Sequence, residues 1–239
     1  MDLSNHHDAG GSQRQDRSSA PLNAEQLSAI ARTLYTEGPF LLRTLQHWRP
    51  YICPFENLVG HVQDGSRVLD IGCGAGLLLG LVAGIGREFE GVGFDVSQPA
   101  IDVARSMVKR AALIAPKAKL TFECLQIEDA WPEGKFDVVF LVDVLHHVPA
   151  GSQRPFLRQV ISKVKPGGVL IYKDMCMRPW WKSQANRLHD LVVARQFITY
   201  APVQAVEQWA NEEGMRVILR EDISRFCYGH ELRMLTASD

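Results

Sequence analysis

The sequence lacks three features that would narrow its function: a cysteine framework, an excess of one charge and a long hydrophobic run. Its five cysteines are scattered without a Cys-x-x-Cys pair, which argues against a disulfide framework and a zinc site. With 26 Lys and Arg against 27 Asp and Glu, the net charge of -1 offers nucleic acid no general attraction, so a nucleic-acid partner is not expected. The longest apolar run, residues 77–85, is too short and glycine-broken to span a bilayer. The polar N-terminus does not resemble a signal peptide, so we expect a cytoplasmic protein.

The length of 239 residues suits one α/β domain with a full core. Residues 1–20 are polar without an apolar period, which predicts a disordered tail. Residues 21–60 carry apolar side chains at helical spacing, and Pro50 and Pro54 interrupt that pattern, so two or three helices are expected there. Residues 61–239 then alternate strand-like and helix-like segments and form the predicted core domain.

A glycine-rich turn follows the first predicted strand. Residues 67–71 form a short, mostly apolar run, typical of a strand buried in a parallel sheet. Gly72, Gly74 and Gly76 then allow the backbone to turn sharply and to approach a ligand closely. Because residues 77–81 suit a helix, the turn lies between a strand end and a helix N-terminus. Ligands bind at that place in open α/β sheets.

The spacing of these glycines argues against a nicotinamide dinucleotide. That fingerprint is Gly-x-Gly-x-x-Gly, whereas its sixth position is Leu77 here. A carboxylate, Asp70, precedes the first glycine by two residues and would favour a ligand with cationic groups. The string from Val68 to Gly76 resembles motif I of the class I methyltransferases that use S-adenosylmethionine. The resemblance implies that the turn wraps the amino-acid end of this cofactor, that Asp70 helps to hold its ammonium group, and that S-adenosylhomocysteine is the product.

Further cofactor residues follow from spacing and from the same resemblance. Asp95 ends the second predicted strand nineteen residues after Gly76, close to the spacing at which an acid meets a ribose. The family's adenine-binding acid and backbone amide correspond to Gln126 and Ile127, with Glu128 or Asp129 as alternatives if the loop shifts. The full implied cofactor set is Asp70, Gly72, Cys73, Gly74, Gly76, Asp95, Val96, Gln126, Ile127 and Leu141.

The order of the remaining segments resembles the same family as far as residue 174. Residues 136–172 look like its motifs IV to VI. The resemblance predicts an α/β fold: a Rossmann-like, seven-stranded, mostly parallel sheet with helices on both faces. Residues 21–60 would form an N-terminal helical lid, and residues 175–202 a helical insertion after strand 5; packing of the first helices on the sheet edge is the alternative. Expected strands are residues 67–71, 91–95, 120–124, 136–142, 169–173, 215–219 and 231–236, with helices at 154–164 and 203–211 and a turn at 165–168.

The insertion carries the candidate acceptor residues. Trp180, Trp181 and Tyr200 would lie above the carboxyl end of a strand, and aromatic side chains there suit an apolar acceptor. The alternative is an ordinary amphipathic helix that packs Leu188 and Leu191 inward.

His146 and His147 are the candidate catalytic bases. They follow the fourth predicted strand, and imidazole near neutral pH suits proton removal from a hydroxyl. A structural role in closing the loop is the alternative. Asp143-x-x-His146-His147 also resembles the Glu-x-x-Glu-His metal triad of certain methyltransferases. The second Glu is missing and Asp143 can cap the following turn, so no metal site is predicted.

The sequence therefore predicts a methyltransferase that acts on an oxygen or carbon of a small apolar or aromatic molecule, including a lipid-linked, carrier-linked or membrane-associated one. One alternative is a protein or RNA acceptor, although residues 142–145 do not form an Asn-Pro-Pro-Tyr loop. Another is a partner subunit that binds S-adenosylmethionine without catalysis. The sequence does not indicate the acceptor or the oligomeric state.

Overall fold

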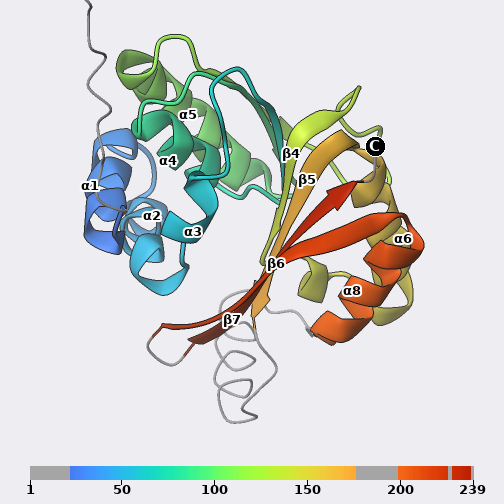
Figure 1. Cartoon of the computed structure of the whole chain (residues 1–239). Coiled ribbons are helices and arrows are strands. Elements are labelled where there is room, and N and C mark those ends of the chain that lie inside the picture. The colour runs from blue at the N-terminus through green and yellow to red at the C-terminus, as the bar shows by residue number, and fades with distance from the viewer. Residues whose placement is uncertain (1–21, 176–198, 226–227, 238–239) are drawn as a thin grey trace, which may run out of the picture.

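A seven-stranded sheet with helical layers on both faces forms the protein (Figure 1). The structure is a computed structural model that describes residues 22–175, 199–225 and 228–237. The strands lie in the order β3-β2-β1-β4-β5-β7-β6, in which β1 to β5 are parallel and β7 is antiparallel to both β5 and β6. The predicted fold class is confirmed. The strands are β1 Arg67–Ile71, β2 Glu90–Asp95, β3 Lys119–Cys124, β4 Phe136–Val142, β5 Val164–Met175, β6 Met215–Arg225 and β7 Tyr228–Ala237.

Two hydrophobic cores separate the helical layers from the sheet. One face is covered by α4 (Leu77–Gly84) and α5 (Gln98–Ile114), with the N-terminal helices α1 (Ala24–Leu34), α2 (Phe40–Ile52) and α3 (Glu56–Val59) packed beside them. The other face is covered by α6 (Ala150–Ser162) and α8 (Val203–Glu212), as Figure 1 shows. A short 3-10 turn, η1 (Leu145–His147), follows β4.

Local sequence explains most of these elements. β1 is buried along almost its whole length, as expected for a central parallel strand. Ser97 caps α5, since its Oγ accepts a hydrogen bond from the Ala100 N–H at 3.4 Å. The chain builds β1, β2 and β3 outward and then returns to place β4 on the other side of β1. This reversal creates the crevice at the carboxyl ends of β1 and β4 in which open α/β sheets bind ligands.

The structure corrects several expected boundaries. Pro50 does not end a helix: it is buried within the last turn of α2, where packing offsets the one backbone hydrogen bond that proline cannot donate. α6 begins at Ala150, four residues earlier than expected. The expected turn at 165–168 lies within β5, because Val164 also pairs with Phe136 of β4 before the register shifts. β6 and β7 are longer than expected, since charged residues alternate along the exposed edge strand and weaken its apolar pattern.

The long β6–β7 hairpin holds the N-terminal helices against the sheet. His230 Nε2 lies 2.9 Å from the Ile52 carbonyl at the end of α2, and Asn57 Nδ2 donates to Glu221 Oε2 at 3.0 Å. Arg225 forms an ion pair with Glu56 at the start of α3. These contacts join segments at opposite ends of the chain and bring α2 to the carboxyl edge of the sheet, where the hairpin extends past the other strands (Figure 1).

Candidate cofactor and acceptor site

The glycine turn after β1 has the backbone shape that its sequence predicts. Gly72, Gly74 and Gly76 all have positive φ values, of 69°, 54° and 75°. A Cβ at Gly76 would lie 2.7 Å from the Phe122 ring, so both the backbone angle and the space require glycine there. The turn therefore presents bare backbone at the crevice.

Asp95 connects the glycine turn to the end of β2. Its Oδ2 accepts the Gly74 N–H at 2.8 Å, and its Oδ1 accepts the Ser97 N–H at 2.8 Å. The Phe94 carbonyl accepts the backbone N–H groups of the first two turn residues. Each carboxylate oxygen has a second lone pair, so Asp95 can hold the turn and still accept hydrogen bonds from a ligand.

Asp70 lies at the floor of a small cavity beside the turn. Only 3% of its surface is exposed, and burial raises its pKa to about 8, while Arg49 acts in the opposite direction and Asp95 adds to the increase. The cavity is lined by Arg49, Phe55, Asp70, Gly72, Cys73, Leu78 and Val142. A cationic ligand group beside Asp70 would restore its ionised form. Sequence reasoning missed Arg49, since nothing in the periodicity of α2 shows which arginine turns toward the sheet.

Cys73 contributes backbone, not thiol chemistry, to this cavity. Its side chain is buried, and desolvation, followed by the charges of Asp70 and Asp95, raises the pKa of the thiol well above its usual value. A protonated thiol is a poor nucleophile.

A buried ion pair occupies the ends of β4 and β5. Lys173 Nζ lies 2.6 and 2.8 Å from the two carboxylate oxygens of Asp143, and Arg49 Nη2 lies 3.7 Å from Oδ2. Burial opposes ionisation of Asp143, but Lys173 and then Arg49 outweigh it and lower the pKa to about 2. Asp143 has a left-handed φ of 57°, which its pairing with Lys173 helps to hold. Among the described residues, no group of three His, Cys, Asp or Glu side chains is arranged to hold a metal.

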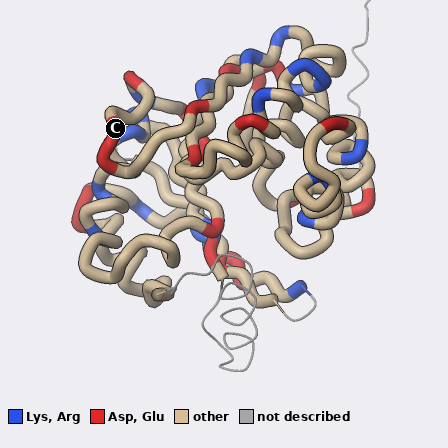
Figure 2. Tube along the Cα trace, turned by 180° about the vertical axis from the view of Figure 1, so that it is seen from behind, with Lys and Arg blue, Asp and Glu red and all other residues tan. Residues whose placement is uncertain are grey.

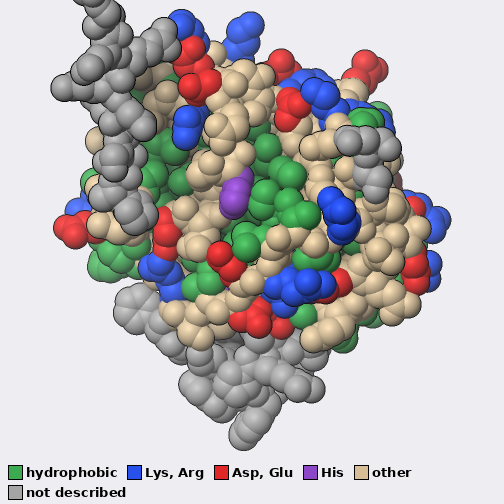
Figure 3. Space-filling model, viewed as in Figure 1, with side chains coloured by type: hydrophobic (Ala, Val, Ile, Leu, Met, Phe, Trp, Pro, Cys, Tyr) green, Lys and Arg blue, Asp and Glu red, His purple; other side chains and the backbone are tan. Residues whose placement is uncertain are grey.

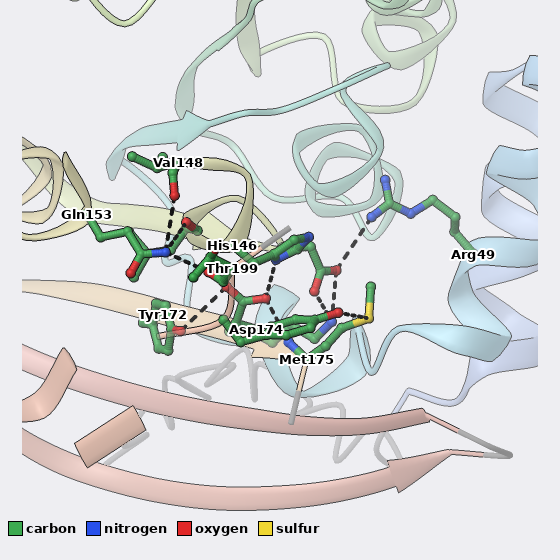
Figure 4. A network of polar contacts seen from close by, with 12 residues as sticks. Arg49, His146, Val148, Gln153, Tyr172, Asp174, Met175 and Thr199 are labelled. Carbon is green, nitrogen blue, oxygen red and sulfur yellow. Dashed lines mark hydrogen bonds and ion pairs between the residues drawn. The ribbon is translucent and has the colours of Figure 1, made fainter. Parts of the chain in front are cut away.

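His146 and Asp174 form a second buried pair next to the first. Nδ1 of His146 lies 2.5 Å from Asp174 Oδ1 (Figure 4). Because a carboxylate only accepts, this contact places a proton on Nδ1, and in the neutral ring the lone pair is then on Nε2. Asp174 also accepts the Met175 N–H at 2.8 Å and is oriented by the Tyr172 hydroxyl at 3.5 Å. The pair links η1 to the end of β5.

Gln153 fixes the backbone around His146. Its amide nitrogen donates to the carbonyls of Leu145, Val148 and Thr199, at 3.3, 3.1 and 2.6 Å (Figure 4). The Thr199 N–H in turn donates to the His146 carbonyl at 3.0 Å. The η1 turn and the segment before α8 are therefore held as one unit.

The two candidate histidines differ in environment. His146 is fully buried, whereas His147 is exposed, although their ring centroids are only 4.1 Å apart. Tyr200 is brought next to them, with its ring centroid 5.3 Å from that of His146. The other two candidate acceptor residues, Trp180 and Trp181, lie outside the described residues, as do residues 1–20 and most of the insertion.

The expected adenine residues lie at the rim. Gln126, Ile127 and Val96 are exposed, and the Gln126 N–H is held by Asp129 Oδ2 at 2.7 Å. Leu141 is fully buried, so its side chain belongs to the core.

The comparisons with known proteins agree with this geometry. The sequence model of a family described as a methyltransferase domain matches residues 42–219, about three quarters of the chain. The chain belongs to this family. A ubiquinone biosynthesis O-methyltransferase of Neisseria meningitidis is 28% identical over 172 residues, which cover 70% of this chain and 64% of that protein. The chain thus spans less than two thirds of the length of the curated relatives named here. It covers 44% of the length of the Bradyrhizobium diazoefficiens enzyme of the same name, at 33% identity.

Solved structures of methyltransferases share the fold of this protein. Magnesium protoporphyrin IX methyltransferase from Synechocystis, with bound SAH, superposes with a TM-score of 0.61 at 19% identity, over 88% of this chain and 93% of that one. An O-methyltransferase from neocarzinostatin biosynthesis, in complex with SAH and 1,4-dihydroxy-2-naphthoic acid, also gives 0.61 at 18% identity, over 81% of this chain and 56% of that one. None of the helices in the described part of the chain has the length and hydropathy to cross a membrane.

Proposed function

We propose that this methyltransferase-family protein transfers a methyl group from S-adenosylmethionine to a hydroxyl oxygen of a small aromatic molecule. The observation that carries the proposal is the cavity at the glycine turn, in which the buried Asp70 carboxyl lies beside Arg49, next to the turn that Asp95 holds. Methylation of carbon, or of a protein or RNA acceptor, is less well supported. Among the described residues, basic and acidic side chains are interspersed along the trace (Figure 2), so this part of the chain offers a nucleic acid no continuous basic track.

The residues at the crevice fit the polar groups of this cofactor. Asp70 would hold the ammonium group and Arg49 the carboxylate of its methionine part. Asp95, which keeps acceptor capacity on both oxygens, would hold the ribose hydroxyls. The exposed rim around Gln126 and Ile127 would receive the adenine. α1 to α3 would form the lid, because Arg49 comes from α2 and the Tyr35 hydroxyl donates to the Ala75 carbonyl of the glycine turn at 2.8 Å.

The bound cofactor supplies an activated methyl group on a sulfonium, so the protein mainly has to orient the acceptor. Alignment of two reactants can lower a barrier by about 7–11 kcal/mol. We assign His146 as the general base that takes the hydroxyl proton on Nε2 as the new C–O bond forms. Asp174 would hold the ring and stabilise the imidazolium that results, as the carboxylate does in Ser-His-Asp sites. Tyr200 would contact the aromatic acceptor.

An aromatic hydroxyl is also the acceptor class that the comparisons favour. The relatives named above are O-methyltransferases of ubiquinone biosynthesis, and one structural neighbour holds a dihydroxynaphthoic acid. A buried base suits a weakly acidic hydroxyl more than an amine, which needs less help with its proton. The proposal includes aromatic acceptors that are linked to a lipid or to a carrier.

Calorimetry with S-adenosylmethionine tests the cofactor assignment, and turnover with a panel of phenols, catechols and quinols tests the reaction. We expect micromolar binding and methylated product detected by mass spectrometry. Absence of binding would refute the proposal, and binding without turnover on any acceptor would favour the non-catalytic subunit. The adjacent exposed histidine is the matched control for the base: His146→Asn should lower kcat by about 10²–10⁴-fold, whereas His147→Asn should change it less than about threefold.

A further inference from the structure

Helix α2 carries its large hydrophobic side chains on the outside of the protein. Phe40, Leu41, Leu45 and Trp48 are 74%, 77%, 43% and 56% exposed, and we refer to these four as the α2 stripe. Hydrophobic side chains also lie at the surface on the side that the N-terminal helices form in Figure 3. Four large exposed apolar residues on one short helix need a physical reason, unlike single ones.

The helical period shows that these side chains are exposed because they share one side of α2, not because the helix ends fray. At 3.6 residues per turn, the α2 stripe lies on one side of the helix, and the two buried residues, Gln46 and Pro50, lie on the opposite side. The helix is amphipathic with its apolar face outward. Arg43 lies beside one end of that face, with its guanidinium carbon 6.0 Å from the Phe40 ring centroid and its Nη1 donating to the Thr36 carbonyl at 2.8 Å. α2 contains no Asp or Glu.

The charge of this face decides between two kinds of partner. The exposed fractions correspond to roughly 500 Å² of apolar surface, because a whole aromatic side chain offers about 150–250 Å². A stable protein dimer buries about 800 Å² on each partner, of which somewhat more than half is apolar, so the area of the stripe suits either occupant. A helix at a lipid surface needs only an apolar face with an aromatic residue and basic residues beside it, since it enters the headgroup boundary by about 5–10 Å.

We propose that the α2 stripe docks the protein on the surface of a bilayer that contains anionic lipids. Trp48, Phe40 and the two leucines enter the headgroup boundary, and Arg43 beside them meets lipid phosphates. The Trp48 ring is already packed against Tyr51, with centroids 5.5 Å apart, so little side-chain freedom is lost on docking.

The docked helix also carries a residue of the site. Arg49, also in α2, extends to Asp143 at the end of β4 (Figure 4). A docked α2 therefore holds the crevice close to the bilayer, from which an apolar acceptor could enter without crossing water. This last step rests on the proposed function, whereas docking itself does not.

Co-sedimentation with vesicles tests the proposal. Vesicles of phosphatidylcholine with about 30% phosphatidylglycerol are compared with pure phosphatidylcholine. The chain should bind the anionic vesicles, and a Leu41→Ser, Leu45→Ser, Trp48→Ser variant should bind at least tenfold more weakly. Leu113→Ser is the matched control, because Leu113 is 78% exposed at the end of α5, and it should bind as the wild type does. Arg43→Gln should weaken binding to anionic vesicles only.

Two results would overturn the proposal. One is vesicle binding by the triple variant equal to that of the wild type, which would place the lipid contact elsewhere. The other is a concentration-dependent dimer, seen by light scattering, that the triple variant abolishes, since the stripe would then serve a second copy. Calorimetric binding of S-adenosylmethionine is measured on each variant; retained binding shows folded protein and keeps failure of docking separate from failure of the proposed function.

Discussion

Replacement of Asp70 by Asn is the sharpest test of the cofactor site. In the free protein the pKa of Asp70 is about 8, so at pH 7 the carboxyl is mostly protonated. An ammonium group beside it favours the ionised form. Binding of S-adenosylmethionine at pH 7 should therefore release protons from the wild type, up to about one per site, and almost none from Asp70→Asn.

Isothermal titration in buffers of different ionisation enthalpy counts these protons. For the wild type, the association constant should rise close to tenfold per pH unit between pH 6 and 7 and level off toward pH 8, because the carboxyl then starts out ionised. The slope should vanish in Asp70→Asn, whose affinity at pH 7.5 should be lower. The cofactor's own amino group, whose ordinary pKa is about 7.7–8.0, is already mostly protonated between pH 6 and 7, so the comparison is made in that range. Equal proton release by the two proteins would refute the assignment.

The same substitution should stabilise the free protein. Between pH 3.8 and 8 the folded state keeps a proton on Asp70 that the unfolded state has lost, so this group lowers stability as pH rises through that window. At 1.36 kcal/mol per pH unit, Asp70→Asn should raise the free energy of unfolding at pH 7 by at most about 4 kcal/mol, and the gain should disappear near pH 4. Urea unfolding measures it, with exposed Asp102→Asn as the control. If Asp70→Asn weakens cofactor binding and stabilises the free protein, the buried Asp70 carboxyl lowers the stability of the free protein for the sake of ligand binding.

Three further substitutions test other parts of the site. Gly76→Ala should lower cofactor affinity at least tenfold and lower the free energy of unfolding in urea by about 2–4 kcal/mol, since the φ of Gly76 is 75° and the new Cβ would meet Phe122. Unchanged affinity would show that the turn does not bind the cofactor. Lys173→Met should cost about 3–5 kcal/mol, because the buried Asp143 loses its nearest cation and keeps Arg49 at 3.7 Å. The loss should shrink at low pH or when Asp143→Asn is added, and a pH-independent loss would point to packing instead. Gln126→Ala should change stability by less than about 0.5 kcal/mol and affect only cofactor affinity, measured by calorimetry, as expected for an exposed rim residue.

Local elements of the fold followed from sequence because their causes are local. The first strand and the fourth were predicted at their observed bounds, since both are short buried runs between polar or glycine residues. The sharp turn expected at the three glycines also has a local cause, since their positive φ values depend on neighbours a few residues away. The expected two or three helices before β1 are α1, α2 and α3, although Pro50, which interrupts the apolar pattern, lies inside α2.

The pairs that set the chemistry of the site did not follow from sequence. His146 meets Asp174 across 28 residues, and Lys173 meets Asp143 across 30. In both, the partner lies at the end of a neighbouring strand, and only the order of strands in the sheet decides which strands are neighbours. Arg49 is more distant still, because the β6–β7 hairpin from the other end of the chain helps to hold α2 in place.

Sequence alone determined that this chain makes a parallel sheet with a close-approach turn and two acids at its edge, because period, spacing and glycine geometry act over a few residues. Tertiary structure alone decided which histidine is buried against a carboxylate, which arginine faces Asp70, and that α2 turns its apolar side outward. Burial is a property of the whole packing arrangement, and so are the pKa values and exposed surfaces that follow from it.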